Sequence, residues 1–116
     1  MKETLTVRQP YASMLVTGRK YYEFRSWPLP ERHIHKPIRI HSAAREAKAA
    51  IGCTEETFKD GLKTARENRL FSAILGEVVF GRPFLILPGL YAWPVIDSTA
   101  YVEPVRNVKG RLGIWK

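Results

Sequence analysis

The sequence has a single cysteine, Cys53, and no apolar run approaching the roughly 20 residues that a membrane-spanning helix needs. One cysteine excludes an internal disulfide and a zinc cluster built on cysteines. The first seven residues alternate polar and apolar side chains, which is typical of a strand and lacks the apolar stretch of a signal peptide. We therefore expect a reducing, cytoplasmic setting and no membrane association.

Acidic residues are also scarce, since 11 Asp and Glu stand against 19 Lys and Arg, a net charge of +8 in 116 residues. Residues 1–50 contain ten Lys or Arg and four Asp or Glu, so they carry +6 of that charge. Clustered cations favour a polyanionic partner because binding releases its counterions. A basic protein that is merely soluble has the same overall charge, so composition alone leaves both interpretations open.

The length and the 45% content of hydrophobic residues fit one domain, residues 1–116, that buries its own core. Short alternating segments separated by a few helical ones predict an α+β fold, a small β-barrel of about five to six strands with two or three flanking helices. Helices are expected at residues 10–17, at residues 43–51 and after Thr54, a good N-cap. Strands are expected at residues 4–8, 21–25, 37–41, 72–80, 84–87, 91–96 and 112–116.

Residues 18–27 combine cations, a carboxylate and aromatic side chains at a turn that leads into a strand. Gly18 allows the sharp turn, which places Lys20 at the mouth of the strand. Glu23 and Arg25 then share one face of that strand, and Trp27 follows it. Such a cluster suits an anionic, planar, hydrogen-bonding ligand, and a nucleotide is all three. The alternative is a surface ion pair with Trp27 packed at the rim of a barrel.

The pattern Gly-x-Lys-x-x-Glu-x-Arg followed by Ser-Trp resembles the signature of ASCH domains, which are relatives of the PUA fold. Further segments at residues 5–12, 38–43, 74–78 and 108–116 resemble the family's strands in the same order, so the resemblance covers nearly the whole chain. It implies a PUA-like barrel with the Lys20, Glu23 and Arg25 cluster in a cleft between barrel and helices. It also implies RNA or single-stranded nucleic acid as the partner, with a modified nucleoside as a further candidate ligand.

Residues at other strand ends are expected beside the same cleft. Arg8 would contact phosphate and Gln9 a base edge, while Tyr11 would stack where the family commonly has Trp. The predicted nucleic-acid-binding residues are Arg8, Gln9, Tyr11, Lys20, Glu23, Arg25, Trp27, Arg39, His41 and Ser42. Lys109 and Arg111 would extend the path of the phosphates. A lone histidine at a strand end, such as His41, is more typical of a structural hydrogen bond than of catalysis.

Two other classes of function stay open. Some ASCH proteins resemble ribonucleases, and a related subgroup resembles amidohydrolases that act on N4-acetylcytidine. In an enzyme, Lys20 and Glu23 would be the catalytic residues, with a desolvated Lys20 activating water. That subgroup has Thr where this chain has Glu23, which argues against a simple transfer of its mechanism. A module that binds an acidic protein is the third class.

The remaining ionisable residues give weaker signals. Glu77 lies inside an apolar run, so it must be paired or face a wet cavity, and the structural role is favoured over an acid–base role. His33 and His35 have a spacing that is only weakly indicative of metal, and neither a metal nor a cofactor is expected. We take a monomer as the default state.

Overall fold

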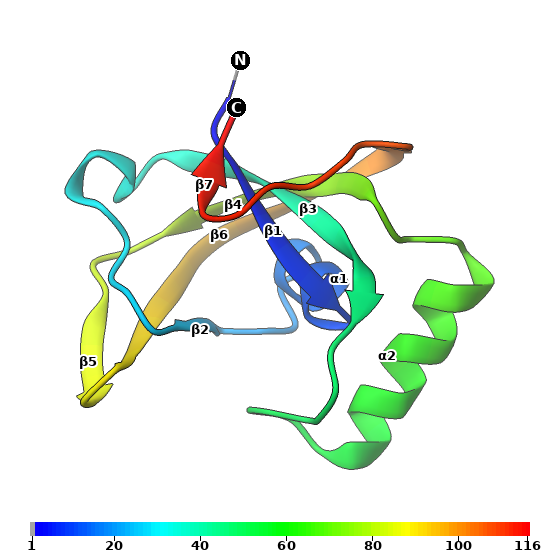
Figure 1. The fold of residues 1–116 in the computed structure, drawn as a ribbon, viewed down its shortest axis with the longest axis horizontal. Coiled ribbons are helices and arrows are strands. Elements are labelled where there is room, and N and C mark those ends of the chain that lie inside the picture. Colours follow the sequence, from blue (N-terminus) through cyan, green and yellow to red (C-terminus); the bar gives the residue numbers. More distant parts are fainter. Residues whose placement is uncertain (1) are drawn as a thin grey trace.

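Seven strands form one curled sheet in a computed structural model, which describes residues 2–116 (Figure 1). The hydrogen-bonded order is β2-β6-β4-β3-β1-β7, and β5 joins at β6. β1 and β3 run parallel, and the other pairs are antiparallel. The strands are β1 (Thr4–Gln9), β2 (Tyr22–Arg25), β3 (Pro37–Glu46), β4 (Ala73–Phe80), β5 (Phe84–Leu87), β6 (Leu90–Val105) and β7 (Ile114–Trp115). This arrangement confirms the predicted α+β class with a small PUA-like barrel.

Two helices flank the sheet among the residues described (Figure 1). Helix α1 (Tyr11–Val16) packs against β1, β3, β4 and β6, and most of its side chains are buried. Helix α2 (Glu55–Glu67) begins at Thr54, whose hydroxyl accepts a hydrogen bond from the amide of Thr57 at 3.1 Å. It buries Phe58, Leu62 and Ala65. The predicted N-cap of α2 is therefore confirmed. In β1, Leu5 and Val7 are buried and Arg8 is exposed, but Thr4 is fully buried as well, so burial does not alternate along the whole strand.

The helix predicted at residues 43–51 is wrong. Strand β3 continues to Glu46, which pairs with Gln9 at the end of β1, and the amide of Ala47 donates to the carbonyl of Gln9 at 2.9 Å. The alanines in this segment favour a helix, but pairing with β1 overrides that weak preference. Residues 47–53 then form neither helix nor strand.

The strand predicted at residues 91–96 is also longer than expected, because β6 pairs with β2 and β5 in its first part and with β4 in its second. A register shift between Val95 and Asp97 lies beside Pro94, as its lack of an amide hydrogen predicts. The β6 backbone approaches Gly76 closely, since a Cβ there would lie 2.1 Å from the carbonyl oxygen of Thr99.

No helix within residues 2–116 is long and apolar enough to cross a lipid bilayer.

Candidate nucleic-acid-binding site

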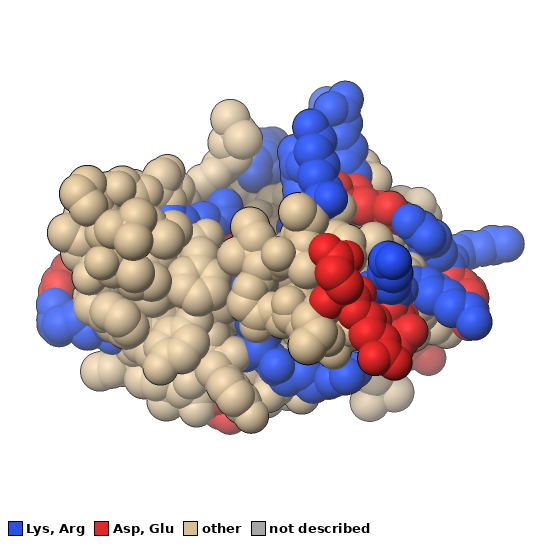
Figure 2. All heavy atoms as spheres, turned by 90° about the horizontal axis from the view of Figure 1, so that it is seen from below, with Lys and Arg blue, Asp and Glu red and all other residues tan. Residues whose placement is uncertain are grey.

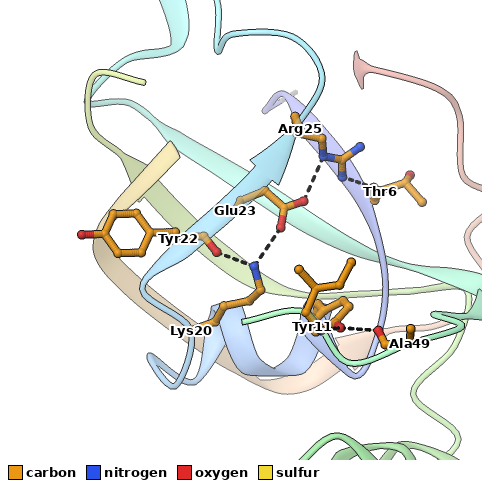
Figure 3. Close-up of polar contacts among 8 residues, drawn as sticks. Thr6, Tyr11, Lys20, Tyr22, Glu23, Arg25 and Ala49 are labelled. Atoms are coloured by element: carbon orange, nitrogen blue, oxygen red, sulfur yellow. Dashed lines mark hydrogen bonds and ion pairs between the residues drawn. The ribbon is translucent and has the colours of Figure 1, made fainter. Parts of the chain in front are cut away.

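Glu23 lies on β2 between two cations, with one carboxylate oxygen directed to each (Figure 3). Lys20 Nζ is 3.4 Å from Glu23 Oε1, and Arg25 Nε donates to Glu23 Oε2 at 2.9 Å. Glu23 and Lys20 are both buried, while the Arg25 side chain keeps 23% of its surface exposed. The cluster of Lys20, Glu23 and Arg25 therefore has a formal charge of +1, and the cation that reaches solvent is Arg25.

Lys20 is positioned by the turn that ends α1. Gly18 has a φ of 76°, a left-handed conformation that glycine adopts without strain, and the amide of Lys20 donates to the carbonyl of Met14 at 3.1 Å. The Lys20 ammonium also donates to the carbonyl oxygen of Tyr22, and it lies 4.9 Å from the centre of the Phe24 ring. Burial lowers the pKa of Lys20, and attraction to Glu23 opposes part of that effect.

Arg25 links β2 to β1 across the pocket. Its Nη2 donates to the carbonyl oxygen of Thr6 at 2.8 Å, while its Nε is held by Glu23 (Figure 3). A guanidinium carries five N–H donors, so further donors remain for a ligand. Arg25 is thus held in place and still able to contact an anion.

Tyr11 fixes the position of residues 49–51 through hydrogen bonds to their backbone. Its hydroxyl donates to the carbonyl oxygen of Ala49 and accepts from the amide of Ile51, both at 2.6 Å. Burial raises the pKa of Tyr11. With its hydroxyl occupied by the backbone, Tyr11 offers a ligand its ring, which also lies 5.3 Å from Lys20 Nζ.

These side chains line one pocket of about 570 Å³. That volume is within the usual range of small-molecule sites. The predicted site residues that the structure brings together there are Arg8, Tyr11, Lys20, Glu23, Arg25 and Trp27. The rest of the lining is Thr6, Val7, Phe24, Ser26, Ala43, Ala47, Ile51, Arg111, Leu112 and Gly113.

Four predicted site residues, Gln9, Arg39, His41 and Ser42, do not line this pocket. Gln9 is fully buried and donates to Ser13 Oγ and to the carbonyl oxygen of Leu70, each at 2.8 Å. Arg39 donates to Thr4 Oγ1 at 3.0 Å. These hydrogen bonds hold the fold together: Gln9 joins β1 to α1, and Arg39 joins β3 to β1.

His41 and Ser42 are likewise buried and bonded within the protein. His41 Nε2 is 2.5 Å from the carbonyl oxygen of Val108, which can only accept, so this nitrogen carries a proton. Burial lowers the pKa of His41. Ser42 Oγ donates to the carbonyl oxygen of Ala73 at 3.1 Å. The structural interpretation of His41 thus fits better than ligand binding.

The wall of the pocket between residues 43 and 51 was missed by sequence reasoning, because that segment was expected to be helical. Its small and apolar side chains carry no chemical signal of their own. Of the two cations expected along the path of the phosphates, Arg111 lines the pocket and Lys109 does not.

Glu77 lies outside this pocket lining and is fully engaged elsewhere. It accepts from Lys2 Nζ at 2.7 Å and from the Tyr101 hydroxyl at 2.6 Å. These contacts lower the pKa of Glu77, and burial together with Glu77 raises the pKa of Tyr101 to about 12. The contacts fit the structural role that the sequence favoured. Within residues 2–116, no three His, Cys, Asp or Glu side chains gather as metal ligands do.

Comparison with known protein families matches residues 5–78 to the ASCH domain. This match covers more than half of the chain, including all of β1 except Thr4, the Lys20, Glu23 and Arg25 cluster, and β3. No curated protein matches the chain. The matched segment supplies all the pocket residues except Arg111, Leu112 and Gly113, and the chain therefore belongs to the ASCH domain family.

Proposed function

We propose that this domain binds single-stranded RNA and holds one nucleotide in the pocket between β2, α1 and residues 43–51. The observation that carries the proposal is the cluster of Lys20, Glu23 and Arg25, which places excess positive charge in a partly enclosed pocket of about 570 Å³. An anion that enters would neutralise this charge without the protein having to reorganise.

Each part of a nucleotide has a matching group in the lining. Arg25 has donors left for phosphate, and the exposed Arg8 and Arg111 provide charge for neighbouring phosphates. The rings of Tyr11 and Trp27 offer faces on which a base can stack. Trp27 is itself steadied by an edge-to-face contact with the buried Trp93, with ring centres 4.9 Å apart.

Salt dependence is the first test of this proposal. In a fluorescence anisotropy titration with labelled single-stranded RNA, we expect affinity to fall with a log–log slope of roughly −2, as for about three phosphate contacts. Arg8→Ala should make the slope less steep by about 0.7. The matched control is Arg32→Ala, since Arg32 is exposed and outside the pocket. Absence of RNA binding at low salt would exclude the proposal.

A second candidate function is hydrolysis of RNA or of a modified nucleoside such as N4-acetylcytidine. It is favoured by the position of the Lys20 amine, which is buried 3.4 Å from Glu23 Oε1, where burial lowers the pKa of Lys20. A neutral amine accepts a proton from water, and the Glu23 carboxylate 3.4 Å away would take part in moving it. The two substrate classes, RNA and N4-acetylcytidine, are those that the resemblance to ASCH proteins implies.

Product analysis separates the two candidates. Protein incubated with N4-acetylcytidine or with single-stranded RNA, followed by chromatography, should give products at a rate that rises with pH as Lys20 loses its proton. Lys20→Met should lower the rate by about 100-fold or more. Lys59→Met, on the exposed face of α2, is the control. Equal product from the wild type and Lys20→Met would remove the hydrolase.

A further inference from the structure

Residues 83–96 contain no charged side chain, although the protein as a whole has a charge of +8. They form β5, the turn at Pro88 and Gly89, and the first half of β6. All four residues of β5, Phe84 to Leu87, are apolar and between 44% and 56% exposed. Because successive strand residues face opposite sides, both faces of β5 are left about half exposed by the rest of the described chain.

The outer edge of β5 is open as well. It pairs with β6 and with no other strand within residues 2–116, so a row of backbone N–H and C=O groups lacks a strand partner. Edge strands are usually protected by a charged side chain, most often lysine, which β5 lacks. The nearby Arg82 is engaged in an ion pair with Glu31, with Nη2 to Oε1 at 2.8 Å.

Neighbouring side chains enlarge this surface into one apolar patch. The rings of Tyr22 and Phe84 make an edge-to-face contact with centres 6.0 Å apart, and Tyr21 and Ile96 are 73% and 58% exposed. Figure 2 shows a broad uncharged surface on the side where β5 lies in Figure 1, with most charged side chains on the opposite side. We call this surface the β5 patch: Tyr21, Tyr22, Phe84, Leu85, Ile86, Leu87 and Ile96.

We propose that the β5 patch is a homodimer interface, in which β5 of one copy pairs antiparallel with β5 of a second copy. A strand that pairs antiparallel with its own copy forms a two-fold symmetric contact, so one surface is sufficient for both partners. This proposal replaces the monomer expected from the sequence, and it does not depend on the RNA-binding proposal.

The distribution of charge favours a second copy of the protein over RNA as the partner that covers the β5 patch. Two copies with +8 each repel one another, and they approach at least cost over a surface that carries no charge. The same surface offers a polyanion no cation to bind. The exposed apolar area is on the order of 600 Å² per copy, which reaches the low end of stable interfaces when both copies are counted.

The dimer would leave the nucleotide pocket open, since no residue of the β5 patch lines it. The dependence of binding on salt concentration therefore distinguishes the dimer proposal from the RNA-binding proposal. Screening weakens repulsion between the copies, so dimerisation should strengthen at high salt, whereas RNA binding should weaken.

Sedimentation equilibrium is the test. Between about 1 and 200 µM, the range in which interfaces of this size associate, we expect the apparent mass to rise from 13.3 kDa toward twice that value. Leu85→Lys should raise the dissociation constant by at least about 30-fold, because it adds like charges to an apolar edge. Val102→Lys is the matched control, since Val102 is 96% exposed and lies outside the patch.

Hydrogen exchange on the wild type gives a readout that does not depend on a variant folding. The amides of β5 should become protected as the protein concentration rises, while those of α2 stay unchanged. A protein that sediments at 13.3 kDa at every concentration and salt would overturn the proposal. So would a dimer that both Leu85→Lys and Ile86→Lys leave intact, or a monomer that uses the patch for a different protein.

Discussion

Replacing Lys20 and Arg25 together by alanine is expected to lower the affinity for single-stranded RNA by about 100-fold or more. The change converts a largely buried cluster of charge +1 into one of charge −1: it removes a charge-assisted hydrogen bond from Arg25 to phosphate, which contributes about 1.5 kcal/mol or more, and also the neighbouring positive charge of Lys20. Fluorescence anisotropy at low salt measures the loss. Circular dichroism would establish that the variant is folded.

The matched control variant loses two positive charges that lie outside the pocket. Arg32 and Lys59 are exposed and lie outside the pocket, so the double replacement Arg32→Ala and Lys59→Ala tests net charge alone. We expect a change of less than about 3-fold from it. Equal losses from the two double variants would mean that RNA is held by general surface charge and not by the pocket.

Arg25→Ala alone gives the same test with less disturbance of the fold. It leaves the Lys20–Glu23 ion pair, which is neutral overall, and we expect a loss of about 10-fold in affinity. An unchanged affinity would remove Arg25 as the phosphate ligand.

Glu23→Gln is expected to cost about 3 kcal/mol of folding free energy, or roughly 10 °C in Tm. The carboxylate is buried and compensates Lys20 and Arg25 at once, so its removal leaves two neighbouring cations without a counter-charge. We place the cost at the low end of the range for broken buried pairs because Arg25 still reaches water. Thermal unfolding followed by circular dichroism measures it.

The control is Glu31→Gln, the same chemical change in an exposed ion pair. Glu31 is bonded to Arg82 through both carboxylate oxygens, at 2.8 and 2.9 Å, but solvent screens the pair. We expect Tm to move by less than about 2 °C. Similar shifts for the two variants would show that Glu23 does not hold the cluster together.

The deficit of Glu23→Gln should become smaller as pH rises. Burial lowers the pKa of Lys20 in the folded state, so above that pKa the unfolded chain binds more protons and stability increases with pH. Without the attraction of Glu23, the folded pKa of Lys20 falls further, and the increase starts at lower pH. Denaturant unfolding between neutral pH and about 10 tests this sign.

The sequence predicted those parts of the fold that local patterns determine. The strand of Glu23 and Arg25 and the burial of Leu5 and Val7 in β1 follow from alternation, and the N-cap at Thr54 follows from capping chemistry. The helix predicted at residues 43–51 failed because a long-range contact, the pairing of Glu46 with Gln9, decides that segment. The helix propensity of the local sequence does not depend on such a contact and so could not predict it.

In the candidate site, too, the features that depend on nearby residues were predictable and others were not. Lys20, Glu23 and Arg25 come together because they lie within six residues around one turn, so their proximity was predictable. Placing both Arg8 and Gln9 beside the pocket was wrong, because successive residues of a strand face opposite sides. Gln9 follows Arg8 directly on β1, but Gln9 bonds to Leu70 in the interior while Arg8 lines the pocket.

A nuclear magnetic resonance titration of the ¹⁵N-labelled protein with cytidine 5′-monophosphate tests the central claim most directly. We predict chemical shift changes concentrated in residues 6–11, 20–27, 43–51 and 111–113, the four segments that enclose the pocket. Their absence in Arg25→Ala would tie them to the cluster. Shifts confined to the exposed face of α2, or no shifts at millimolar nucleotide, would contradict a nucleotide pocket built on Lys20, Glu23 and Arg25.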